Sequence, residues 1–127
     1  MKGFLAMSKR KVQIKENMGI EYNGSIYPLV FNLNVMEQIQ EKYGTIDHWG
    51  DLTDGKSHEV NAKAIKFGLT AMLNEGVDMW NEENENKREF FTEKQVGRII
   101  TELGLAETAK KVNTTVIESA KSDEKNS

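Results

Sequence analysis

The chain contains no cysteine, a single proline and no long run of apolar residues. A protein without cysteine cannot hold a disulfide framework, a thiolate zinc site or an iron–sulfur cluster, and it has no cysteine nucleophile. No apolar stretch approaches the roughly 18 residues that a membrane-spanning helix needs. The segment Phe4-Leu5-Ala6-Met7 is too short for the core of a signal peptide. We therefore expect a soluble intracellular protein that does not enter a membrane.

The overall charge is weakly acidic, with 17 basic residues, 20 acidic residues and a net charge of −3. Nucleic-acid binding requires a basic face, so the composition disfavours a protein that wraps DNA or RNA. The exception is a basic leader at residues 1–11, which we expect to be flexible. It could be an arm that contacts nucleic acid, but a solubilising terminus is the favoured interpretation. Met7 could equally be the natural start.

The first part of the domain reads as strands. Val12 and Ile14 alternate with polar residues, and two further short apolar segments flank Asn23-Gly24. Asn-Gly is the strongest short signal for a hairpin, because both residues tolerate a positive φ. Pro28 cannot donate to a ladder, so the strand before it should be an edge strand or bulged. The sequence predicts a β-hairpin or a three-stranded meander here.

The remainder of the chain reads as helices separated by glycines and capping residues. Thr92 with Gln95 forms a capping-box pattern at the start of a helix that Gly104 should end. The other expected helices start at Asn34, Asn61 and Ala106 and end near Gly44, Gly76 and Ala120, and Thr45 could cap a short turn that holds Ile46, Trp49 and Leu52. We predict one α+β domain over residues 12–120, with a β-hairpin or meander followed by a four- to five-helix, bundle-like part. Residues 121–127 lack apolar side chains and are expected to be a disordered tail.

No motif predicts an active site, so we expect no catalytic, cofactor-binding or metal-ligating residues and no enzyme. His48 and His58 lie near several aspartates, but their spacing fits no metal motif, and a solvated loop is the favoured interpretation. A calcium loop with Gly55 as its sixth position would have three wrong ligand positions. The sequence has no nucleophile elbow and no glycine-rich phosphate loop.

Large apolar residues bracket an acidic stretch in the second half of the chain. Met79, Trp80, Phe90 and Phe91 lie on either side of the segment from Glu82 to Glu89. Methionine and aromatic side chains are enriched at binding surfaces, where each provides a large contact area. Burial in the core is the commoner fate of such residues. Both interpretations stay open at this point, and the four residues are the candidate partner-binding residues.

The order of these motifs resembles that of the tail assembly chaperones of long-tailed bacteriophages and prophages, particularly those of Gram-positive hosts. The resemblance covers about residues 20–105. It depends on the helix start Phe31-Asn32-Leu33-Asn34, the turn with Trp49 and Leu52, the long helix ending near Gly76, and the segment from Phe91 to Ile100. The polar stretch 81–89 is longer than the family pattern leads us to expect.

The resemblance implies a non-enzymatic role in tail morphogenesis. A member of this family would bind the tape-measure protein, and possibly the tail-tube protein, in the cytoplasm of the host bacterium. It would be absent from the mature virion, and it could form a homo-oligomer. The alternatives are a structural component of the phage tail or head–tail joint, and a small nucleic-acid-binding regulator.

Overall fold

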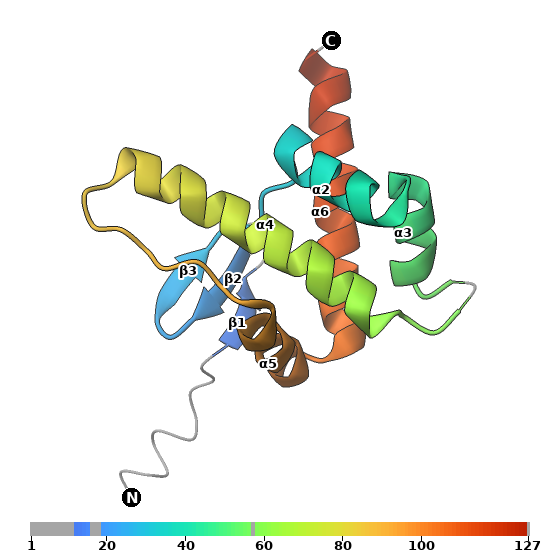
Figure 1. Ribbon diagram of the computed structural model, residues 1–127, viewed down its shortest axis with the longest axis horizontal. Helices are drawn as coiled ribbons and strands as arrows, with labels where there is room; N and C mark the ends of the chain where they lie inside the picture. Colours follow the sequence, from blue (N-terminus) through green and yellow to red (C-terminus); the bar gives the residue numbers. More distant parts are fainter. Residues whose placement is uncertain (1–11, 16–18, 57, 127) are drawn as a thin grey trace, which may run out of the picture.

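The computed structural model describes residues 12–15, 19–56 and 58–126 and has a three-stranded antiparallel meander followed by five packed helices (Figure 1). The predicted α+β class is confirmed. The predicted basic leader, residues 1–11, lies outside the described residues. The elements are β1 (Val12–Lys15), β2 (Gly19–Tyr22), β3 (Ser25–Tyr27), α2 (Leu33–Tyr43), α3 (Ile46–Thr53), α4 (Ala62–Glu83), α5 (Glu93–Leu103) and α6 (Leu105–Asn126).

The sheet has the strand order β1-β2-β3, and the hairpin at Asn23-Gly24 is confirmed. Both turn residues have positive φ, 51° for Asn23 and 85° for Gly24, as a two-residue type I′ connection requires. Strand β3 is an edge strand that ends just before Pro28. Since an edge strand has one side without ladder partners, the missing N–H of this proline disrupts no pairing.

The predicted caps at Thr45, Asn61 and Thr92 are confirmed, and Thr45 caps a helix of eight residues. The side chains of Thr45, Asn61 and Thr92 each accept a hydrogen bond from the main-chain N–H three residues later. At Thr92 the capping box with Gln95 is complete, because the Gln95 side chain accepts in return from the Thr92 N–H at 2.8 Å. Gly104 follows α5 with φ 96°, as predicted.

The predicted start of α2 is wrong by two residues. Asn32, rather than Asn34, is the N-cap, and its Oδ1 accepts from the Val35 N–H at 3.2 Å. The Asn34 side chain instead donates to the Glu75 carboxylate at 3.1 Å. Both asparagines are chemically suited to cap, and the extended backbone at Asn32 decides which one does so.

Helix α4 does not end at Gly76 as predicted but continues to Glu83. A Cβ atom at Gly76 would lie 2.7 Å from the carbonyl oxygen of Pro28. The glycine therefore permits the segment after β3 to approach the helix closely. From the sequence alone, a glycine that permits close packing inside a helix cannot be distinguished from a glycine that ends the helix.

Helix α6 also runs further than predicted, to Asn126, in place of a disordered tail from residue 121. Lysine and glutamate in this segment are good helix formers. A helix satisfies its own backbone hydrogen bonds, so a segment without apolar residues can still be helical. A lack of apolar residues therefore does not by itself predict an absence of helix.

Helix α4 is the central element, and it contacts α2, α3, α5, α6 and β3 (Figure 1). Its buried face joins a core that includes Trp49 of α3, whose indole N–H donates to the Ala64 carbonyl at 3.0 Å. The distal turns of α4 extend beyond the sheet in Figure 1, and the chain then returns towards α5. Among the described helices, none combines the length and apolar character needed to cross a bilayer.

Candidate partner-binding surface

Three of the large apolar side chains that are exposed in the described part of the chain come from one region. Met79 and Trp80 belong to the distal turns of α4, and Phe90 belongs to the segment that returns beside them. We call residues 78–90 the α4 tip. The other two, Leu33 and Ile117, come from α2 and α6. The α4 tip therefore supplies most of the exposed large apolar side chains among the residues that the structure describes.

Two asparagines of α4 hold the returning segment. The Asn81 side chain accepts from the Arg88 N–H at 2.8 Å and donates to the Arg88 carbonyl at 3.0 Å. The Asn74 side chain makes the same pair of bonds with Phe91, at 2.7 and 2.9 Å. Because the asparagines are seven residues apart, they lie on the same face of the helix two turns apart. The segment is thus fixed along α4 at two points.

An arginine is sandwiched between two aromatic rings at the base of the α4 tip. The Arg88 guanidinium carbon lies 3.9 Å from the centre of the Trp80 ring and 4.3 Å from that of Tyr27. Its Nη1 also donates to the Ile26 carbonyl at 3.0 Å. A planar guanidinium is suited to stacking on aromatic faces. The sandwich joins the distal turns of α4 to strand β3.

The end of α4 has its own internal contacts. The Trp80 indole N–H donates to the Asn86 carbonyl at 3.0 Å, and the Asn84 side chain donates to the Trp80 carbonyl at 2.9 Å. The Lys87 ammonium donates to the carbonyls of Asn81 and Asn84. A cation at this position satisfies carbonyl groups that a helix leaves without partners at its C-terminus. The exposed apolar groups are therefore carried by an ordered framework.

The structure separates the four predicted residues into two groups. Phe90, Met79 and Trp80 are 53%, 42% and 36% exposed, but Phe91 is only 7% exposed. The Phe91 ring packs edge-on against Tyr22 and Tyr27, with ring centres 5.5 and 5.0 Å apart. The structure thus favours the core interpretation of Phe91 over the partner-binding one, since a buried side chain offers almost no contact area. It belongs to the core that supports the tip.

The charge of the α4 tip is dominated by carboxylates. Its five acidic residues are all exposed, and none has an ion-pair partner among the residues that the structure describes. The two cations of the tip, Lys87 and Arg88, are engaged by main-chain carbonyls and aromatic rings. The surface thus combines apolar side chains with an acidic rim formed by Asp78, Glu82, Glu83, Glu85 and Glu89.

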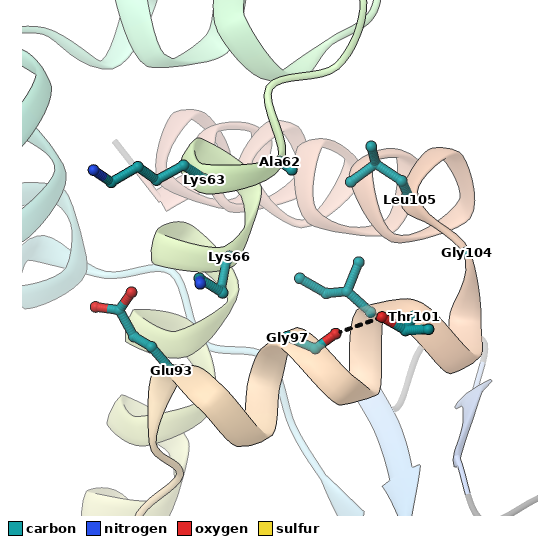
Figure 2. A pocket seen from close by; sticks show the side chains of 9 residues that line it. Ala62, Lys63, Lys66, Glu93, Gly97, Thr101, Gly104 and Leu105 are labelled. Atoms are coloured by element: carbon teal, nitrogen blue, oxygen red, sulfur yellow. Dashed lines mark hydrogen bonds between the residues drawn. The ribbon is translucent and has the colours of Figure 1, made fainter.

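A separate groove of about 590 Å³ lies where the start of α4 meets α5 and α6 (Figure 2). Lys63 and Lys66 of α4 and Glu93 of α5 give it both signs of charge. The Thr101 hydroxyl nearby donates to the Gly97 carbonyl at 3.0 Å, so it is already satisfied within α5. The groove presents no set of side chains that identifies a ligand class.

The two histidines do not lie in a cluster of ligands. His48 is exposed in the first turn of α3, and His58 is exposed in the loop before α4. In residues 12–15, 19–56 and 58–126, no three histidine, aspartate or glutamate side chains are grouped as a metal site. Burial raises the pKa of Tyr43, and the nearby Glu93 carboxylate raises it further.

Sequence reasoning identified the exposed apolar residues but missed the framework that holds them. Neither Arg88 nor the two asparagines was singled out, although the spacing of seven between Asn74 and Asn81 places both on one helix face. That spacing was a usable signal. Each asparagine bonds to main-chain groups, however, and the sequence does not show which main-chain groups a side chain will meet.

Comparisons with known proteins add no relative to this description. No protein-family model matches the chain, and neither a curated protein nor a solved structure does. The function proposed below is therefore supported by the α4 tip and by the motifs that resemble the tail assembly chaperones.

Proposed function

We propose that this protein is a non-enzymatic tail assembly chaperone of a long-tailed bacteriophage or prophage. It binds the tape-measure protein in the cytoplasm of the host while the tail is built, and it does not enter the mature virion. The observation that carries the proposal is the α4 tip, where exposed Met79, Trp80 and Phe90 are held on an ordered framework with an acidic rim.

The physical demand on such a chaperone fits this surface. A tape-measure protein exposes long apolar helical stripes before tube subunits surround it. A protein that keeps it soluble needs an apolar contact surface, and it needs surrounding charge so that it does not itself aggregate. Three apolar side chains among five exposed carboxylates meet both requirements. The contact area is small, so many copies binding weakly along a repetitive partner suit it better than one tight complex.

Co-expression with the tape-measure protein of the same phage tests the proposal. The wild-type chain should raise the soluble fraction of that partner and should co-purify with it. The double substitution Met79→Ala/Phe90→Ala should abolish both effects while leaving the fold intact, because both side chains are largely exposed. Leu33→Ala/Ile117→Ala is the matched control, since it removes two even more exposed apolar groups elsewhere.

Two results would contradict the proposal. Unchanged solubility of the tape-measure protein in the presence of the wild-type chain would count against a chaperone. Detection of the chain in purified particles by mass spectrometry would favour a structural component of the tail. The described strands, of four, four and three residues, form a smaller sheet than we expect of a tube-forming subunit.

A further inference from the structure

We infer that the α4 tip recognises an amphipathic helix whose apolar stripe is flanked by lysine and arginine residues. The inference rests on the proposed function and deepens it, because it states which segments of a long partner are bound. It is carried by three observations: an apolar stripe that leaves the core, carboxylates without partners, and acidic residues where the helix itself disfavours them.

The apolar stripe of α4 continues past the body of the protein. Leu73 and Val77 are buried, and Trp80 follows at helical spacings of seven and three. Met79 follows the buried Met72 by seven residues and is 42% exposed. A helix that leaves a core normally becomes polar, because apolar groups gain nothing by facing water. Here the stripe is extended into solvent, which fits a face completed by a partner.

The acidic rim fixes the sign of the partner's charge. Lys87 and Arg88 cannot neutralise the rim, because both cations are already bonded within the tip. Each carboxylate is exposed and has no ion-pair partner among the described residues. An approaching acidic segment would be repelled, whereas a basic one would be attracted and oriented. The apolar groups supply contact area, and the rim supplies selectivity.

Two of the acidic residues occupy positions that oppose the helix dipole. Glu82 and Glu83 lie in the last turn of α4, and that turn contains no basic residue. The C-terminus of a helix carries partial negative charge, so carboxylates there are unfavourable and cations are favourable. A residue choice that opposes local stability is expected where function requires it. The rim therefore has a purpose other than stabilising α4.

The bonds that hold the returning segment favour a helical partner over an extended one. The N–H and carbonyl groups of both Arg88 and Phe91 are already bonded to asparagine side chains. An added strand would need such main-chain groups to be free, whereas a helix satisfies its own hydrogen bonds and presents side chains alone. The tip is thus suited to side-chain contact.

Peptide titration tests the inference directly on the full chain. Two synthetic helices of about 18 residues, long enough to form a helix, share one leucine stripe and differ only in their flanks, Lys/Arg or Glu. We expect the basic peptide to shift the tryptophan emission, and we expect this binding to weaken as salt rises. The acidic peptide should leave the emission unchanged. Trp49 is 1% exposed, so the signal reports on Trp80.

Charge reversal supplies the matched variants. Glu82→Lys/Glu83→Lys should weaken binding of the basic peptide at least fivefold. The thermal midpoint of this variant should be equal to or above that of the wild-type protein, because cations are favourable at the C-terminal end of a helix. Glu37→Lys/Glu41→Lys makes the same change in net charge on exposed positions of α2. This control should bind as the wild type does.

Failure of the inference can be told from failure of the proposed function. Equal binding of both peptides, or equal affinity of the Glu82→Lys/Glu83→Lys variant and the wild type, would overturn the inference. If the co-expressed tape-measure protein were still solubilised, and Met79→Ala/Phe90→Ala still abolished that effect, the chaperone role would stand without it. Selective, salt-sensitive binding of the basic peptide without any effect on the tape-measure protein would leave the inference standing and remove the role.

Discussion

Asn81 on α4 bonds to both main-chain groups of Arg88, accepting from its N–H at 2.8 Å and donating to its carbonyl at 3.0 Å. The side-chain amide replaces the pairing that a neighbouring strand would provide. This contact places the Arg88 side chain between Trp80 and Tyr27. Asn81 is therefore one of the polar side chains on which the order of the α4 tip depends.

Replacement of Asn81 tests this dependence. Asn81→Ala should expose the Arg88 N–H to solvent and cost about 1–2 kcal/mol, the usual range for losing such bonds. Native-state hydrogen exchange should show reduced protection at the Arg88 amide and retained protection at Phe91, which Asn74 holds. Asn74→Ala should show greater loss at Phe91. Unchanged exchange at Arg88 in Asn81→Ala would refute the role of this contact.

The stacked arginine gives a second prediction. Arg88→Lys keeps the charge but removes the planar group that lies between the two rings. We expect a loss of about 1 kcal/mol in the free energy of unfolding and greater exposure of Trp80. Urea unfolding and acrylamide quenching of tryptophan measure these effects. Arg98→Lys is the control, because Arg98 is exposed on α5; equal effects of the two substitutions would contradict the stacking argument.

The third prediction concerns close packing against α4. Gly76→Ala places a Cβ atom 2.7 Å from the Pro28 carbonyl oxygen, so the segment after β3 must move. Overpacking of this kind costs about 1–3 kcal/mol. Gly50→Ala in α3 meets no atom within 4 Å and should stabilise the protein by up to about 1 kcal/mol, because alanine is the better helix former. Thermal unfolding of both variants checks the opposite signs.

The fourth prediction concerns alkaline pH. The pKa of Tyr43 is raised from its ordinary value of 10.0 by burial and by the Glu93 carboxylate. The unfolded chain therefore loses this proton before the folded one, so stability present below pH 10.0 should decline as the pH rises further.

Ultraviolet titration of tyrosinate, with Tyr43→Phe as the reference, isolates this group. Glu93→Gln should lower the pKa of Tyr43 only in part, because burial is the larger cause. A return of that pKa all the way to 10.0 in Glu93→Gln would show that the ranking of causes is wrong.

The local signals in the sequence predicted much of the fold. Asn23-Gly24, Thr45, Asn61 and the Thr92/Gln95 pair act through bonds to near neighbours in the chain, and each lies where its pattern indicates. The misplaced end of α4 depends instead on a contact between distant segments. Gly76 is a helix interior because the segment at Pro28 passes over it, and no local pattern records that approach.

The candidate surface shows the same contrast between local signals and contacts of distant segments. Exposed Phe90 and buried Phe91 are neighbours of one type, and only the packing of Tyr22 and Tyr27 decides which of them faces inward. Composition predicted an apolar group beside an acidic run, which is where the exposed residues lie. The identity of the inward ring required knowledge of a sheet about 65 residues earlier in the chain.

The two ends of α4 differ in what holds them, and this has an energetic consequence. The proximal turns are buried by α3, α5 and α6, whereas the distal turns are held by the returning segment, through Asn81, Arg88 and Lys87. Regions with few buried apolar contacts open at a lower free energy than the core. We therefore expect the distal turns to open at a lower free energy than the proximal turns, so that this end of α4 can fray while the rest of the molecule stays folded.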